Sequence, residues 1–158
     1  MADEGGIKIV CENRKAFHNY YIEDKWEAGL VLTGTEVKSL RAQSPNLRDA
    51  FVEVQSRGSK MEAWLLNAHI GPYSHGNIWN HEAVRKRKLL LHRRQIEQIY
   101  GAITQKGLSV IPIRMYFKKG RAKVELGLGK GKKKYDKRET LKKKSAQHEM
   151  DVALKYKG

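Results

Sequence analysis

The sequence predicts a mainly β fold, a small closed barrel with three added helices and a basic C-terminal tail. Three observations predict it. A chain of 158 residues suits one domain with a modest core. Five segments have strand patterns, and four of them form two pairs joined by glycine-containing turns. An amphipathic helix is expected between the third and fourth strands, which is the order of the OB fold. We therefore predict an OB-like barrel over residues 1–130 and a tail over residues 131–158.

The first part of the predicted barrel begins with a short helix. This helix is expected over residues 13–21, with Asn13 at its N-cap because Asn side chains often accept a backbone hydrogen bond there. A strand over residues 26–32 follows, in which Gly29 marks a bulge or the close approach of another backbone. A second helix is expected from residue 36 to about residue 43, where a Ser-Pro pair ends it.

Two hairpins and one helix make up the rest of the predicted barrel. Residues 49–55 and 61–68 predict the first hairpin, and residues 109–117 and 121–128 predict the second. A helix over residues 92–105 is expected between them, because apolar side chains recur there at helical spacing. These side chains are Ile96, Ile99, Tyr100 and Ile103.

Positive charge is concentrated in two segments. The chain has 32 Lys and Arg residues against 17 Asp and Glu residues, a net charge of +15. Residues 130–158 hold eleven basic and four acidic residues, and residues 85–94 hold six basic residues and no acidic one. Such segments favour polyanions, because phosphates that bind Lys and Arg release condensed counterions. Neither segment has the aromatic face of a helix that lies on a membrane, so nucleic acid rather than an anionic membrane is the predicted partner.

Three leucines lie inside the basic segment 85–94, which is expected to be a loop that leads to the third helix. At least one of Leu89, Leu90 and Leu91 must anchor this loop in the core, whereas an exposed one would pack on a nucleobase or ribose. The sequence leaves both roles open. Basic side chains of the last hairpin extend the predicted nucleic-acid surface: Lys118, Lys119, Arg121 and Lys123.

Simple counts exclude several classes of protein. No stretch reaches the ~18 consecutive apolar residues of a membrane-spanning helix, and the acidic start is unlike a signal peptide, so a cytoplasmic protein is expected. The single cysteine, Cys11, excludes a disulfide framework and a cysteine-rich zinc site. His69, His75 and His81 are expected to be loop residues, because their spacing matches no zinc motif. No metal and no cofactor are therefore expected.

One group of carboxylates is a candidate for catalysis. No nucleophile motif such as G-x-S-x-G occurs in the sequence. Asp24, Glu27 and Glu36 cluster around the first predicted strand, and carboxylates of this kind hold Mg²⁺ for phosphoryl chemistry. The competing interpretation is surface ion pairing with Lys25 and Lys38. An OB-type, Mg²⁺-dependent RNA-processing enzyme that uses Glu27 and Glu36 is therefore kept as the alternative function.

The glycine-rich segment 127–132 has the position of a phosphate-binding loop but not its sequence. A Walker A loop requires four residues between its glycines and a Ser or Thr after its lysine, whereas Lys132 is followed by Lys133. We interpret this segment as a flexible cationic hinge between barrel and tail.

The tail has the composition of a helix that lacks a partner. Residues 132–157 contain neither Gly nor Pro, and most are good helix formers. Positive charge is dense and apolar residues are sparse, so the tail is expected to be disordered when free. RNA phosphates would remove the repulsion, so we expect the bound tail to be helical.

Four motifs occur in the order found in one known family. They are W-E-A-G-L at 26–30, G-x-E-V-K-S-L-R at 34–41, R-K-L-L-L at 87–91 and G-K-K-x-x-D-K-R at 131–138. Together they resemble the SsrA-binding protein family (small protein B), the bacterial partner of transfer-messenger RNA (tmRNA). The resemblance runs from about residue 12 to about residue 144.

The resemblance implies an OB barrel with added helices and a monomeric protein that is not an enzyme. It implies binding to the tRNA-like domain of tmRNA and delivery of that RNA, alanylated, to stalled ribosomes for trans-translation, which rescues the ribosome and tags the incomplete protein. Positions that the family needs for this RNA match Asn13, Glu27 and Leu90. The tail is expected to run from the ribosomal decoding centre into the empty messenger channel.

Two sets of site residues follow from the motifs and the charge pattern. The expected RNA-binding set is Asn13, Glu27, Lys38, Arg41, Arg87, Lys88, Leu90, Lys119, Lys123, Lys130, Lys132 and Lys133. The expected ribosome-binding set in the tail is Tyr135, Asp136, Lys137, Arg138, Lys142, Lys143 and Lys144. Tyr135 occupies a position that is aromatic or His-like in relatives, and it is expected to stack on a ribosomal base.

Overall fold

The computed structural model describes residues 6–74, 80–132 and 138. Ten elements follow one another along this part of the chain. They are β1 (Ile7–Glu12), α1 (Arg14–Asn19), β2 (Tyr20–Leu30), α2 (Gly34–Ala42), β3 (Phe51–Arg57), β4 (Lys60–Leu66), β5 (Arg87–Leu90), α3 (Arg93–Thr104), β6 (Ser109–Lys118) and β7 (Arg121–Gly131).

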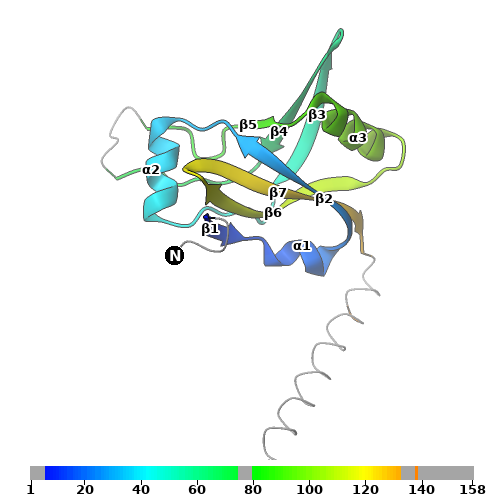
Figure 1. Ribbon diagram of the computed structural model, residues 1–158. Helices are drawn as coiled ribbons and strands as arrows, with labels where there is room; N and C mark the ends of the chain where they lie inside the picture. Colours follow the sequence, from blue (N-terminus) through cyan, green and yellow to red (C-terminus); the bar gives the residue numbers. More distant parts are fainter. Residues whose placement is uncertain (1–5, 75–79, 133–137, 139–158) are drawn as a thin grey trace, which may run out of the picture.

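The strands form one curved, antiparallel sheet in the order β1-β6-β7-β2-β5-β4-β3 (Figure 1). Among the described residues β3 is paired only with β4, and β1 only with β6. The sheet curls until β3 packs against β6, which lies near the other end of the order. The predicted mainly β barrel with three helices is therefore confirmed, and packing rather than a backbone ladder brings its two ends together.

Two of the seven strands are absent from the sequence prediction, which had five, and β2 begins at Tyr20 and not at residue 26. Residues 7–12 form β1, which crosses a bulge between Ile9 and Cys11, so its side chains do not alternate cleanly. Residues 87–90 form β5, although the basic segment around them is predicted as a loop. In β5 the side chains of Arg87 and Leu89 point inward, and those of Lys88 and Leu90 point outward. The sequence does not show this alternation, because an arginine occupies an inward-facing position.

The predicted hinge at residues 127–132 is wrong. β7 continues to Gly131, with β2 on one side and β6 on the other. The glycines serve close packing: a Cβ at Gly127 would lie 2.6 Å from Ile113 Cδ1, and one at Gly129 would lie 2.8 Å from Tyr20 Cβ. Just beyond the strand, the Lys132 N–H donates to Asn19 O at 2.8 Å. The chain leaves the barrel from a fixed position beside α1.

Local sequence explains how the helices start and which faces they bury. α2 begins with a capping box, in which Glu36 Oε1 accepts from the Thr33 N–H at 2.8 Å and Thr33 Oγ1 accepts from the Glu36 N–H at 3.4 Å. α3 buries Ile96 and Ile99, as its spacing predicts, but Tyr100 is exposed. The core under the sheet consists chiefly of Ala28, Leu30, Val52, Ala63, Leu65, Leu89, Ile96, Ile99, Val110, Met115, Val124 and Leu126.

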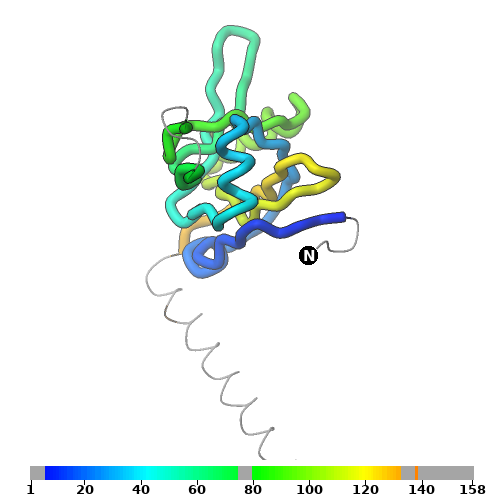
Figure 2. The backbone as a smooth tube through the Cα atoms, turned by 90° about the vertical axis from the view of Figure 1, so that its left-hand side faces the viewer, coloured from blue at the N-terminus to red at the C-terminus, as the bar shows by residue number. Residues whose placement is uncertain are grey.

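The β3–β4 hairpin projects from one end of the barrel, and the chain after β7 leaves at the other end, beside α1 (Figures 1 and 2). No helix of the described residues is long and apolar enough to cross a membrane. The tail predictions lie outside the described residues, apart from Arg138, which is exposed. The residues concerned are Lys133, Tyr135, Asp136, Lys137, Lys142, Lys143 and Lys144.

Candidate nucleic-acid interface

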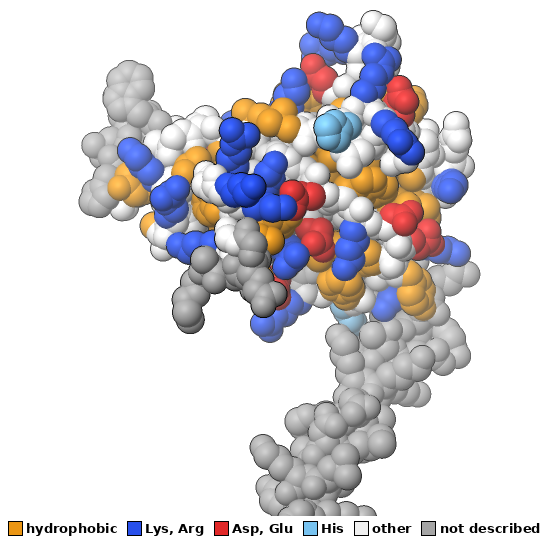
Figure 3. Space-filling view, viewed as in Figure 1, with side chains coloured by type: hydrophobic (Ala, Val, Ile, Leu, Met, Phe, Trp, Pro, Cys, Tyr) orange, Lys and Arg blue, Asp and Glu red, His pale blue; other side chains and the backbone are white. Residues whose placement is uncertain are grey.

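Strand register gathers candidate residues on the outer face of β5, β2, β7 and β6. Directly opposed residues of neighbouring strands point to the same side of a sheet. Leu90 of β5 lies opposite Gly29 of β2, which in turn lies opposite Lys123 of β7. Lys123 lies opposite Tyr116 of β6. In the space-filling view, acidic side chains lie among Lys and Arg at the centre of this face (Figure 3). We call this surface the outer face.

Glu27 is the acidic group that this face holds most firmly. Its carboxylate accepts a short hydrogen bond from the Tyr116 hydroxyl, and Lys118 Nζ lies 3.5 Å away. The bond from Tyr116 and the charges of Lys118 and Lys123 lower the pKa of Glu27, and burial together with the same carboxylate raises the pKa of Tyr116. The Glu27 side chain is nevertheless 41% exposed. A charged, oriented acceptor therefore faces solvent, and it can bind the amino edge of a nucleobase.

The three leucines that follow Lys88 have different environments. Leu89 is in the core, and Leu91 packs partly against it. Leu90 is 55% exposed and lies directly over Gly29, where an added Cβ would be 3.2 Å from Leu90 Cβ. Glycine at position 29 thus leaves the space in which Leu90 sits. Leu90 is an exposed apolar side chain next to charged residues of this face.

The other cations of the predicted set have different surroundings. Lys88 lies on the outer face beside Leu90, 3.9 Å from Glu62, and Lys119 forms the β6–β7 turn with φ +52°. Lys38 and Arg41 lie on α2, where Lys38 Nζ is 5.7 Å from the Tyr73 ring and Arg41 is 5.4 Å from the Phe117 ring.

Lys130 and Lys132 belong to a different place, the end of the chain's last strand. Lys132 Nζ donates to Phe17 O at 3.0 Å and lies 4.8 Å from the Tyr21 ring. The structure therefore does not bring these two lysines together with Glu27 and Leu90.

Two members of the predicted RNA-binding set are buried instead. Arg87 is 0% exposed; its guanidinium donates to Glu36 and, at 2.8 Å and 3.1 Å, to the carbonyls of Ala68 and Ala83. The prediction that Arg87 contacts RNA is therefore wrong, because every face of its guanidinium is turned to protein.

Asn13 is likewise a structural residue. It stands at the N-cap of α1 as predicted, but its side chain makes no cap bond. It is 7% exposed, and its Nδ2 donates to Leu47 O at 3.1 Å and Pro112 O at 2.9 Å. It ties the loop before β3 to strand β6, so its side chain supports the fold.

Glu36 is not free to hold a metal ion. Its buried carboxylate accepts from Arg85, Arg87 and the Thr33 N–H. Burial raises the pKa of this carboxyl, but these three donors outweigh burial and bring it below its ordinary value. The structure thus contradicts a magnesium site built on Glu27 and Glu36. No group of His, Cys, Asp and Glu able to hold a metal ion occurs within residues 6–74 and 80–132.

The partners of the other predicted ion pairs also differ. Lys25 Nζ lies 3.7 Å from Glu125 Oε1, across β2 and β7, and Arg114 Nε lies 3.1 Å from Glu125 Oε2. These exposed and half-buried pairs contribute little to stability. They place two further cations on the outer face.

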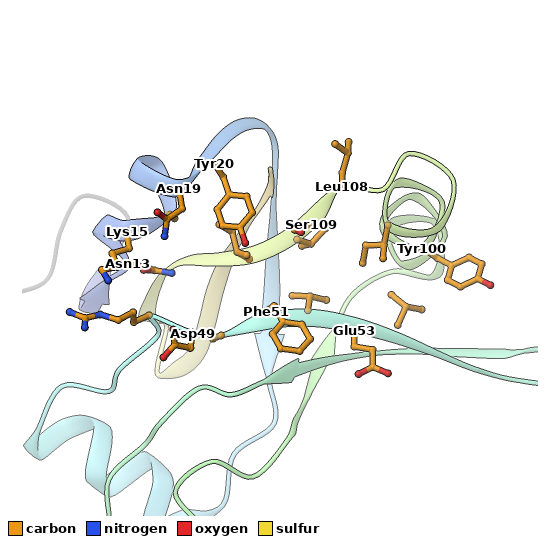
Figure 4. Close-up of a pocket in the computed structure, with 18 of the residues that line it drawn as sticks. Asn13, Lys15, Asn19, Tyr20, Asp49, Phe51, Glu53, Tyr100, Leu108 and Ser109 are labelled. Carbon is orange, nitrogen blue, oxygen red and sulfur yellow. The ribbon is translucent and has the colours of Figure 1, made fainter. Parts of the chain in front are cut away.

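A groove of about 510 Å³ lies away from these residues, between β3, β6, α1 and α3 (Figure 4). Tyr20 and Phe51 line it, while the Tyr100 side chain points away from its centre. Of the predicted site residues only Asn13 lines this groove.

The family model described as SmpB protein matches residues 10–156. The chain belongs to the SmpB protein family. The SsrA-binding protein of Pelobacter propionicus is 59% identical over 152 residues, which is 96% of this chain and 97% of that protein. The SsrA-binding protein of Geobacter sulfurreducens is 54% identical over the same shares of the two chains. A solved structure described as "tmRNA-SmpB: a journey to the center of the bacterial ribosome" has a TM-score of 0.64 and 42% identity, and covers 83% of this chain and 93% of that chain.

One residue that orients Glu27 could not be identified from the sequence. Tyr116 lies in an apolar strand, so the sequence suggests a core residue, and its side chain is indeed almost fully buried. Only the register of β6, β7 and β2 places its hydroxyl against Glu27.

Proposed function

We propose that this protein binds the tRNA-like domain of tmRNA through the outer face and delivers it to stalled ribosomes for trans-translation. The observation that carries this proposal is the oriented Glu27 carboxylate on the same face as the exposed Leu90, with Lys118 and Lys123 nearby, in a chain of the SmpB family. Relatives named SsrA-binding protein and a solved tmRNA–SmpB structure support it.

Each group of the face has a distinct task in this proposal. Leu90 packs against a nucleobase or ribose, and Glu27 accepts from a base amino group. Lys88, Lys119 and Lys123 bind phosphates, which supplies affinity without sequence preference. The protein acts by binding and positioning RNA in the cytoplasm, as a monomer and without catalysis of its own.

Glu27→Gln tests whether fit or charge governs this face. The substitution makes the protein more positive, which by itself strengthens RNA binding. We expect it instead to weaken binding to a transcript of the tRNA-like domain by roughly tenfold, since one good contact to a base is worth about 1–3 kcal/mol. The matched control is Glu23→Gln, an exposed carboxylate on the same strand. Equal or tighter binding by Glu27→Gln would show that Glu27 is an ordinary surface acid.

Salt and Mg²⁺ separate binding from catalysis. About six phosphate contacts predict a loss of about three decades of affinity between ~50 and ~200 mM salt. We expect the transcript to remain intact during incubation with the protein and Mg²⁺. Cleavage that requires Mg²⁺ and protein would favour an RNA-processing enzyme, and an affinity insensitive to salt would contradict the phosphate contacts.

The tail is proposed to serve the ribosome rather than tmRNA. We propose that it is disordered when free and that it folds as a helix in the messenger channel, with Asp136, Lys137 and Arg138 near the decoding centre. Deletion of residues 131–158 is then expected to preserve binding to the tRNA-like domain and to abolish tagging of stalled chains in a reconstituted translation reaction. Loss of both activities would assign the tail to the tmRNA site.

A further inference from the structure

The hairpin of β3 and β4 extends past its neighbour in the sheet. β5 pairs only with Ala63–Leu65 of β4, while the β3–β4 ladder continues as far as Arg57 and Lys60. Gly58, with φ +60°, closes the turn. Residues 55–62 therefore stand clear of the barrel, as both backbone views show (Figures 1 and 2). We call this segment the finger.

The finger is held in place at the start of α3. Arg93 Nη2 donates to Ser59 O at 3.1 Å, and Arg93 Nε lies 3.2 Å from Glu97. Between the finger and the segment from β5 to α3 lies an open groove of about 460 Å³. Its walls include Lys60, Met61, Lys88 and Leu90. The groove therefore borders on the exposed leucine of the outer face.

The acidic side chains around this groove already have cationic partners. Glu62 lies 3.9 Å from Lys88, and Glu97 is paired with Arg93. Arg57 and Lys60, both exposed, form no ion pair with any other described residue. Lys and Arg side chains dominate the tip of the finger in the space-filling view (Figure 3). Lys60 thus lies in the wall of the groove together with Leu90, and Arg57 lies opposite Lys60 in the β3–β4 ladder.

We propose that this groove binds the sugar–phosphate backbone of RNA, next to the nucleotide that packs on Leu90. Lys60 in the groove wall and Arg57 opposite it contact its phosphates, while Leu90 contacts the apolar face of its ribose or base. The proposal rests on the proposed function, because it takes the RNA on Leu90 to be the tRNA-like domain. It adds a second contact area that lies beyond the outer face, along the projecting hairpin. The contact with Ser59 keeps the finger oriented before RNA arrives, which reduces the ordering that binding would otherwise require.

The double variant Arg57→Gln/Lys60→Gln tests the groove in the full-length protein. The control is Lys15→Gln/Lys106→Gln, which removes the same charge from exposed positions on α1 and after α3. Affinity for a tRNA-like transcript and for an unrelated RNA hairpin of equal length is measured at several salt concentrations. We expect the finger variant to bind the tRNA-like transcript about tenfold more weakly, with a salt slope smaller by about 1–2, and the control to stay within about twofold of the parent.

Direct contact is read with a probe at the finger tip. Ser59→Cys, which leaves the carbonyl bonded to Arg93, is labelled with an iron chelate that cleaves nearby RNA, and we expect cuts confined to one stretch of the transcript. Burial raises the pKa of the native Cys11 to about 11, so labelling at neutral pH favours the new thiol.

The outcomes separate the two proposals. Equal weakening in finger and control variants, or no weakening in either, overturns the finger groove, as does the absence of localised cuts. A parent protein that binds both RNAs equally overturns the proposed function, and the finger variant then still tests whether the groove holds RNA backbone. Binding of an acidic protein to the finger with no change in RNA affinity would assign the groove to a protein partner and overturn the proposal.

Discussion

The buried ion pair of Arg87 and Glu36 makes the fold sensitive to either partner. Arg87→Met keeps the length and apolar stem of the side chain but removes the guanidinium. Glu36 then retains Arg85 and the Thr33 N–H, while the carbonyl of Ala68 loses the Arg87 donor and that of Ala83 keeps only the Ile70 N–H. Removing one member of a buried pair destabilises a protein by about 3–5 kcal/mol. Because Arg85 remains, we expect the lower end, about 3 kcal/mol.

The same loss is expected as a fall in Tm of roughly 10 °C, since about 2–4 °C accompanies each kcal/mol at this chain length. Urea unfolding followed by tryptophan fluorescence measures the free energy, and RNA affinity is measured well below the transition. The control is Lys88→Met, the next residue, which faces outward. We expect Lys88→Met to leave stability within about 0.5 kcal/mol and to weaken RNA binding.

The two variants should therefore have opposite profiles. Arg87→Met is expected to bind RNA within about threefold of the parent as long as it is folded. A loss of stability below about 1 kcal/mol, combined with a tenfold loss of RNA affinity, would refute the structural role of Arg87 and return it to the RNA-binding set.

Three further predictions follow from the pKa values and the packing. Because the pKa of Glu36 is lowered by folding, its contribution to stability is complete above the unfolded-state pKa and is lost as the pH falls below about 4.5. Unfolding curves across this range should therefore show a smaller fall in the free energy of unfolding for Glu36→Gln than for the parent. Equal falls would contradict this. Gly29→Val should displace Leu90 and weaken RNA binding as much as Leu90→Ala does. The control is Gly34→Ala, which should bind RNA normally because no atom lies within 4 Å of the added Cβ. Unchanged RNA affinity of Gly29→Val would show that Leu90 does not contact the RNA. A pKa of about 11 instead of 9.0 leaves Cys11 about 100-fold less thiolate at pH 8. Cys11 should therefore react slowly with a disulfide reagent in the folded protein and rapidly in denaturant. A fast reaction in the folded protein would show that the thiol is exposed.

Local chemistry in the sequence predicts most elements but not every strand. The second helix, the third helix and the two hairpins depend on neighbours within a few residues, and each occurs close to its predicted position, although Tyr100 of the third helix is exposed. β5 fails this test because its inward-facing Arg87 is neutralised by Glu36, which lies 51 positions away in the chain. A charged residue reads as solvent-exposed until its partner is known.

The candidate site shows the same limit at the level of single side chains. Glu27 is exposed, and of the three leucines whose roles the residue pattern left open, Leu90 is the exposed one, at the position that the family resemblance implies. Arg87 and Asn13 are buried, and no local pattern distinguishes them from exposed residues of the same type. Gly127 and Gly129 suggest flexibility in the sequence, whereas the side chains of Ile113 and Tyr20 require their small size.

This tight packing makes β7 a rigid connection between the outer face and the start of the tail. Lys123, on the outer face, and Gly131, where the chain leaves the barrel, belong to one strand held by ladders on both sides. RNA that binds the outer face is therefore held at a fixed position relative to the point where the chain leaves the barrel. Under the proposed function, the angle between the bound RNA and the end of β7 is therefore fixed by the sheet before the protein meets a ribosome.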